Sequence, residues 1–201
     1  MSHPVNLRVP ILPVCVGIAL LVATGAASAQ AASGAMSGGA NTASMQSAAK
    51  VSSADKSFVE KAAIGSMAEV QMGKLAQQKA GSDQVKQFGT RMVDDHSKAN
   101  DDLKQVASHK GITLPSDLDA KHKNKMAKLE KLSGAQFDRA YMDDMVADHK
   151  QDVAEFRKEA NSGKDSDIKA FAAKTLPTLE DHLKMAQSTD SAVKASKTAS
   201  R

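Results

Sequence analysis

Hydrophobic residues recur at intervals of three and four positions through residues 54–187, and charged residues fill the positions between them. This is the period of an α-helix that buries one face and exposes the other to water. No stretch of the sequence alternates apolar and polar positions in the way that a half-buried strand does. The pattern therefore predicts an all-α domain.

Capping residues and glycines divide this region into four long helices and one short one. The expected N-caps of the long helices are Asp55, Ser82 or Asp83, Ser133 and Asp165. Their expected ends lie near Lys79, Lys110, Asn161 and Gln187. A shorter helix is expected from about Pro115 to Lys131, and Pro177 should kink the last long helix.

Four long helices with two short outer connections and a long central one predict a four-helix bundle over residues 54–187. The short helix is then an extra element in the central connection. This connection either crosses the length of the bundle, as in ferritin-like folds, or covers one of its ends.

The segments on either side of the bundle have different compositions. Residues 1–29 combine Arg8, an apolar run over residues 9–22 and the sequence Ala27-Ser28-Ala29, which together are typical of a cleaved secretory signal peptide. Residues 30–53 are rich in Ala, Ser and Gly without an apolar period, so we expect a disordered linker. Residues 188–201 are expected to form a flexible tail.

Composition excludes several classes of function. Cys15 is the only cysteine, and cleavage after residue 29 would remove it, so the mature chain would have no thiol for catalysis or metal binding. Cleavage would also remove Arg8, which lowers the formal charge from +4 to +3. Nucleic acid is not an expected partner, because aromatic residues are only 3% of the chain and the basic residues are not clustered.

The most distinctive feature is a near-repeat, in which MVDDH at residues 92–96 is followed by MVADH at residues 145–149. A helix turns about 100° per residue, and this rotation places His96 and His149 at the centres of two apolar faces. His182 lies on the apolar face of the last long helix, nearer its edge. The first helix has no histidine, but Glu69 lies among small residues on its apolar face.

These four side chains are also predicted to lie at similar heights in the bundle. With a rise of about 1.5 Å per residue, and a central connection that crosses the bundle, their levels differ by about 9 Å. Reversing the last two long helices gives nearly the same levels, so this test does not decide the topology. Four buried polar side chains that converge must form hydrogen bonds with one another or bind a ligand, because burying them without a partner is costly.

Two interpretations follow from this convergence. In the first, the four groups bind a single transition metal ion such as Zn, Cu or Fe, because imidazole and carboxylate are suitable ligands for these metals. In the second, they form only a hydrogen-bonded network. The candidate acceptors in such a network, and alternates to the ligands, are Asp95, Asp148 and Asp152. Met92 and Met145 stand one turn from a histidine and could add thioether ligands for copper.

Four stretches share a combined pattern with a known family: FVEKAAIGSMAEVQMGKLAQQKA, FGTRMVDDHSKANDDL, FDRAYMDDMVADHKQDVAEF and FAAKTLPTLEDHLKMA. In these stretches, over about residues 54–187, the chain resembles a bacterial ferritin-like family known as domain of unknown function four-one-four-two. Members of this family are described as predicted outer membrane proteins, and no activity is firmly assigned to them. The resemblance implies an exported ferritin-like bundle. It also implies that the family's helix-one glutamate corresponds to Glu69 and its Asp-His pairs to Asp95-His96, Asp148-His149 and Asp181-His182.

A true ferritin di-iron centre is not expected, because it needs a glutamate three residues before its histidines. Val93, Val146 and Leu179 occupy these positions. The sequence therefore favours a periplasmic bundle that binds a metal ion and acts in metal handling or envelope stress. The alternative is a non-catalytic structural or interaction bundle. An enzymatic role, as a metal-dependent oxidoreductase, ranks last because neither a nucleophile with its base nor a phosphate-binding loop is visible.

Overall fold

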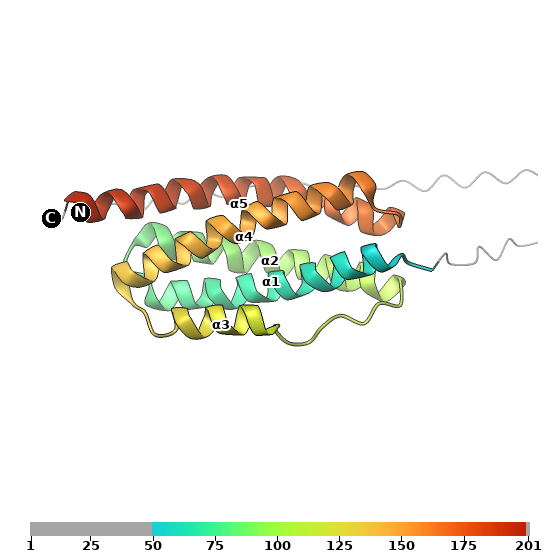
Figure 1. Cartoon of the computed structure of the whole chain (residues 1–201), viewed down its shortest axis with the longest axis horizontal. Helices are drawn as coiled ribbons and strands as arrows, with labels where there is room; N and C mark the ends of the chain where they lie inside the picture. Colours follow the sequence, from blue (N-terminus) through green and yellow to red (C-terminus); the bar gives the residue numbers. More distant parts are fainter. Residues whose placement is uncertain (1–49, 200–201) are drawn as a thin grey trace, which may run out of the picture. The chain divides into compact units, whose positions relative to one another are not determined.

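The computed structural model describes residues 50–199, which form five helices and no strand (Figure 1). The helices are α1 (Ser53–Lys79), α2 (Asp83–His109), α3 (Ala120–Leu129), α4 (Gly134–Ser162) and α5 (Ser166–Ala199). The all-α fold class is confirmed. The predicted signal peptide and residues 30–49 of the predicted linker lie outside the described residues.

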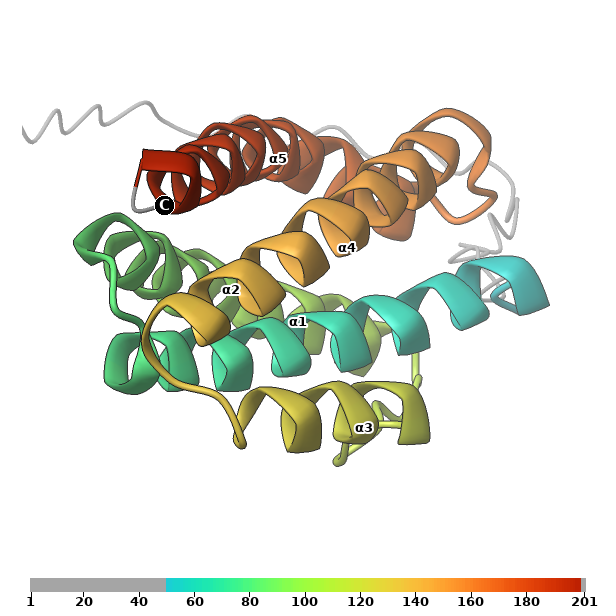
Figure 2. The ribbon, with the colours of Figure 1, turned by 60° about the vertical axis from the view of Figure 1, so that its left-hand side comes forward.

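The four long helices form two antiparallel pairs, α1 with α2 and α4 with α5, as Figure 1 shows. The chain between the pairs crosses the length of the bundle and carries α3 along α1, on the side away from α5 (Figure 2). As a result α4 begins at the same end as the α1–α2 turn. There, the Asp138 carboxylate accepts hydrogen bonds from the backbone N–H groups of Gly81 and Ser82, both at 2.9 Å. The topology that the sequence left open is therefore the crossover.

Two apolar clusters fill the bundle, one toward each end. The cluster near the α1–α2 turn includes Phe88, Met92, Tyr141 and Met145. The cluster toward the other end includes Phe58, Leu103, Val153, Phe156 and Leu179. On α2, α4 and α5 the histidines occur in the sequence between members of the two clusters. The level of the three histidines is therefore a polar layer between two hydrophobic cores.

The start of α1 differs from the prediction. Ser52, not Asp55, is the N-cap, because its hydroxyl accepts a hydrogen bond from the Asp55 N–H at 3.1 Å. The Asp55 side chain is buried and instead accepts hydrogen bonds from the N–H groups of Lys164 and Asp165. This carboxylate joins the start of α1 to the α4–α5 turn, a tertiary role that local sequence does not reveal.

Two other predicted boundaries were wrong. The short helix α3 begins at Ala120 rather than Pro115, because Asp119 caps it by accepting a hydrogen bond from the His122 N–H at 2.8 Å. Helix α5 passes through Pro177 and continues to Ala199, so residues 188–199 are not an irregular tail. Val193 is buried against the core, and Lys194 forms an ion pair with Asp143 of α4 at 2.8 Å. These tertiary contacts extend the helix beyond its predicted end.

Helices α1 and α2 pack closely at two glycines. A Cβ atom at Gly73 would lie 2.7 Å from the carbonyl oxygen of Gly89, and one at Gly89 would lie 2.8 Å from the Ala76 Cβ. Small residues on the face of α1 therefore bring the two backbones together. In the described part of the chain, no helix has the length and apolar character needed to cross a membrane.

Candidate functional site

The three predicted histidines meet in the centre of the bundle. His96 of α2, His149 of α4 and His182 of α5 are 5%, 0% and 1% exposed, respectively. Their ring centroids are 5.8 Å apart for His96 and His149, 5.3 Å for His96 and His182, and 5.4 Å for His149 and His182. We call these three side chains the histidine cluster.

Hydrogen bonds to two of the rings define which nitrogen carries the proton. His149 Nδ1 lies 2.9 Å from the carbonyl oxygen of Met145, which can only accept, so Nδ1 is the donor. His182 Nε2 lies 2.9 Å from Oδ2 of Asp95, so it donates to the carboxylate. When these rings are neutral, the lone pairs therefore reside on His149 Nε2 and His182 Nδ1. Contacts of this kind orient the histidine ligands of many metal sites.

The nitrogens that carry these lone pairs have no hydrogen-bond partner among residues 50–199. His149 Nε2, His182 Nδ1 and also His96 Nε2 are buried and unpartnered. One ring nitrogen from each histidine lies within 4.8 Å of the other two. Zn–N and similar bonds are about 2.0–2.1 Å long, so two ligand nitrogens on one tetrahedral ion lie about 3.4 Å apart. Movements of the rings by up to about 1.4 Å toward one another would therefore let all three bind one ion.

Burial also keeps the histidine cluster neutral. Burial and the nearby rings of His149 and His182 hold the pKa of His96 well below its usual range. Burial, with a further contribution from His182, lowers the pKa of His149 to about 4. The pKa of His182 is also lowered by burial, although the hydrogen bond to Asp95 opposes this shift. Neutral imidazole is the form that binds metals, so the cluster is in its ligand form at neutral pH.

Glu69, which was predicted to complete the ligand set, is not among the described residues whose ligand atoms lie within 4.8 Å of one another. Its side chain is 2% exposed and its Oε2 atom has no hydrogen-bond partner among the described residues. Burial, followed by the nearby charges of Asp152 and Asp148, raises the pKa of Glu69 well above its usual range. The carboxylate instead lines a pocket between α1, α3 and α4.

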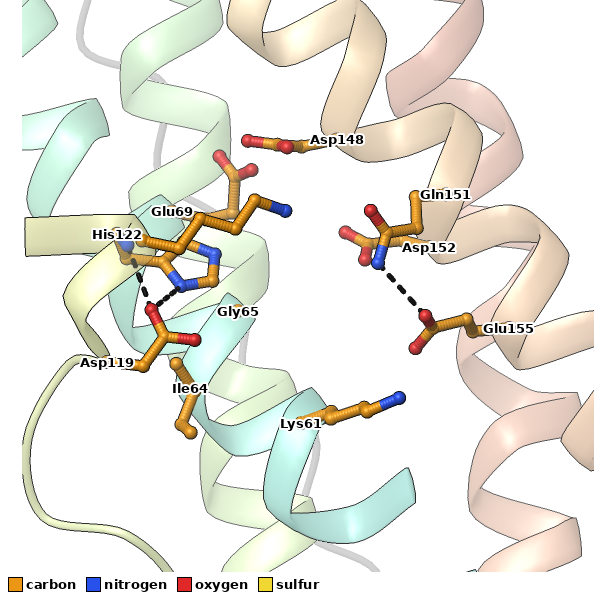
Figure 3. Close-up of a pocket in the computed structure, with 11 residues that line it drawn as sticks. Lys61, Ile64, Gly65, Glu69, Asp119, His122, Asp148, Gln151, Asp152 and Glu155 are labelled. Carbon is orange, nitrogen blue, oxygen red and sulfur yellow. Dashed lines mark hydrogen bonds and ion pairs between the residues drawn. The ribbon is translucent and has the colours of Figure 1, made fainter. Parts of the chain in front are cut away.

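This pocket, which we call the acidic pocket, has a volume of about 170 Å³ (Figure 3). Its lining includes five carboxylates, from Glu69, Asp119, Asp148, Asp152 and Glu155. The basic residues in the lining are Lys61, Lys121 and His122. The sequence suggested that His122 is solvated, but its side chain is only 15% exposed and its Nδ1 lies 2.7 Å from Asp119.

The aspartates predicted to support the histidines have separate roles. The Asp95 carboxylate accepts a hydrogen bond from His182 of another helix, and Arg91 pairs with the same carboxylate. Burial opposes the ionisation of Asp95, but the hydrogen bonds from Arg91 and His182 outweigh it and lower its pKa. The spacing of Arg91 and Asp95, four residues on one helix, was a signal for this pair that sequence reasoning missed.

The remaining predicted residues lie around the site. Asp148 pairs with Lys125 at 2.6 Å rather than with His149, and Asp181 is exposed on α5. Burial, with repulsion from Asp148 and Glu155, raises the pKa of Asp152 to about 7. Met92 and Met145 are fully buried in the apolar cluster near the α1–α2 turn, and the Met145 carbonyl oxygen accepts a hydrogen bond from His149.

Comparisons with known proteins identify the family of the chain. No curated protein and no solved structure matches the chain. A family model described as "Domain of unknown function (DUF4142)" matches residues 40–189. This match covers more than half of the chain and includes α1, α2, α4 and the part of α5 that carries His182. The chain therefore belongs to the DUF4142 family.

Proposed function

We propose that this protein is an exported helical bundle that binds one transition metal ion through His96, His149 and His182. The observation that carries the proposal is that the three histidines converge from three helices, with one ring nitrogen of each within 4.8 Å of the others, and that each ring has a buried nitrogen without a partner among the described residues. A hydrogen-bonded network would pair these nitrogens with donors, since an unpaired buried polar atom is costly. Neutral imidazoles at neutral pH further favour a metal ligand set.

The chemistry of the ligands restricts the metal. Three imidazole nitrogens suit Zn, Cu, Ni or Fe better than Ca or Mg, which prefer oxygen ligands. Because the described residues supply three ligands of this group, a fourth coordination position is available for water or an exogenous ligand. Such a centre suits metal handling, and the role we propose is metal handling or stress protection in the bacterial envelope. Support for export comes from the signal-peptide pattern of residues 1–29.

The test is elemental analysis of the mature protein purified from cells, and again after incubation with Zn, Cu or Fe followed by desalting. We expect one equivalent of metal per chain in the wild type. His149→Ala and His96→Ala should each lose it, because removal of one of three ligands greatly weakens a site of this kind.

A matched control is His109→Ala, which removes an exposed histidine at the end of α2. This variant should retain the metal content of the wild type. If the wild type binds no metal under any of these conditions, the histidine cluster is a structural polar layer and the alternative role as a structural or interaction bundle is correct. Equal metal loss in all three variants would show that binding is not specific to the cluster.

A further inference from the structure

The acidic pocket is distinct from the histidine cluster but is connected to it by shared residues. Gly65 and Asp152 line the acidic pocket, and the same two residues line a second, smaller cavity of about 30 Å³. His96 lines that second cavity. The two cavities therefore lie next to each other, and the second one reaches one of the three histidines.

Glu69 gives the acidic pocket a feature of a binding site that surface acids lack. Its carboxylate is almost fully buried, it lines the pocket, and its Oε2 atom has no partner in the described part of the chain. Figure 3 shows that Asp148 and Asp152 of α4 lie across the pocket from the Glu69 backbone. Burial makes the charged form of this carboxylate costly and thereby raises its pKa, and a bound cation would stabilise the charged form in place of a proton.

Small residues on α1 create the space beside Glu69. A Cβ atom at Gly65 would meet no atom within 4 Å, so the helix leaves an open volume one turn before Glu69. Opposite this space, α4 contributes Asp152 and α3 contributes Asp119. Lys125 pairs with Asp148 at 2.6 Å and with Asp144 at 3.5 Å; its charge lowers the pKa of Glu69, but it makes no hydrogen bond to Oε2 of that residue.

We propose that the acidic pocket binds a divalent metal ion through Glu69 and Asp152, and that this ion then passes to the histidine cluster. The delivery step rests on the function proposed above, whereas the binding step does not. Oxygen ligands and retained water molecules suit a hydrated divalent ion on its way into the protein. The excess of carboxylates over lysines in the lining would also raise the local concentration of cations.

The two steps predict different metal preferences. The acidic pocket should bind Mn²⁺, which carboxylates suit and which binds nitrogen ligands most weakly in the divalent series. The histidine cluster should bind Co²⁺ more tightly, and a Co²⁺ ion with three imidazoles gives a visible absorption band. Mn²⁺ alone and Co²⁺ alone can therefore be used to examine the two sites separately in the mature protein.

The binding step is tested by electron paramagnetic resonance, in which the signal of free aqueous Mn²⁺ falls as the ion binds. Glu69→Gln and Asp152→Asn keep the side-chain shape and remove the charge, and each should weaken Mn²⁺ binding about tenfold or more. The matched controls are Glu60→Gln on α1 and Asp143→Asn on α4, both of which are surface charges outside the acidic pocket. These controls and His149→Ala should bind Mn²⁺ as the wild type does.

The delivery step is tested by stopped-flow absorbance with Co²⁺. Glu69→Gln and Asp152→Asn should reach the same final Co²⁺ absorbance as the wild type, but the rate of loading should fall about tenfold. Glu60→Gln and Asp143→Asn should load at the wild-type rate. Circular dichroism of every variant confirms that the helices are retained.

The possible failures can be separated. If the wild type does not bind Mn²⁺, or if Glu69→Gln and Asp152→Asn bind it normally, the acidic pocket is not a metal site. If Mn²⁺ binds at the pocket but Co²⁺ loading is equally fast in all variants, the delivery step is wrong. If no Co²⁺ reaches the histidines while Mn²⁺ still requires Glu69, the proposed function and the delivery step fail and only the carboxylate site remains.

Discussion

Acidification should destabilise the metal-free protein through the histidine cluster, and His149 is the member for which the size of the effect can be worked out. Its side chain is 0% exposed and burial lowers its pKa to about 4, whereas an unfolded histidine titrates near pH 6.5. Between these values the unfolded chain binds a proton that the native ring does not. Stability therefore falls as the pH falls through this window.

The magnitude follows from the size of the shift. Each pH unit in this window changes the free energy of unfolding by about 1.4 kcal/mol, so the His149 ring accounts for about 3 kcal/mol between pH 6.5 and pH 4. Asp152 acts in the opposite direction, because its raised pKa means that the native state binds the extra proton. Its contribution to stability is lost as the pH rises toward 7. As Asp152 is only partly buried, solvent screening reduces its effect.

Because the two groups oppose each other in the wild type, the informative quantity is a difference between variants. His149→Leu removes the titrating ring without leaving a polar atom behind. Urea unfolding followed by circular dichroism, with a chelator present, should show that the stability of His149→Leu relative to the wild type rises by about 3 kcal/mol as the pH falls from 7 to 4.

For the matched variant Asp152→Asn, the stability relative to the wild type should fall as the pH falls from 7 to 4. If the stability difference between the wild type and His149→Leu is constant from pH 7 to pH 4, the ring is not held neutral by burial. That result would refute the account of the histidine cluster given above.

Three further predictions concern packing, capping and ligand binding. Gly65→Ala should stabilise the protein by about 0.5–1 kcal/mol, because the added methyl group meets open space in a helix. Gly73→Ala should instead destabilise it by about 1–3 kcal/mol, because the methyl group would press on the carbonyl oxygen of Gly89; equal urea midpoints for the two variants would contradict this. Asp138→Ala should cost about 2–4 kcal/mol in the same assay, because two backbone N–H groups at the start of α2 lose their buried acceptor. A metal ion at 100 times its dissociation constant should raise the free energy of unfolding by about 2.7 kcal/mol in the wild type and not in His149→Leu, and an equal gain in both would place the ion elsewhere.

The local sequence was sufficient for the helices and for the direction in which their side chains point. Periodicity placed His96, His149 and His182 on buried faces, and the structure brings these three rings together. Helix ends were predicted well where a cap or glycine lies within one turn, as at Ser133 and Gly163. They were predicted poorly where distant residues stabilise the end, as at Val193 and Lys194 in α5.

The site required information that no single helix contains. The helical period shows on which side of its own helix a residue lies. It does not show which residues of other helices this side contacts, or at what distance. For this reason the sequence grouped Glu69 with the histidines, whereas packing against α3 and α4 places it on the acidic pocket. Asp95 was predicted as a hydrogen-bond acceptor for the buried groups, and the structure shows that its partner is His182, 87 positions away in the chain, which helical phase alone does not specify.

The sequence by itself determined the all-α class, the four long helices and the buried position of the histidines, because these properties depend on residues three or four positions apart. Only the tertiary structure decided the crossover, the separation of the histidine cluster from the acidic pocket, and the partners of each carboxylate. These features depend on how helices distant in the sequence pack together, and close packing permits one arrangement of their side chains among many that the helical pattern allows.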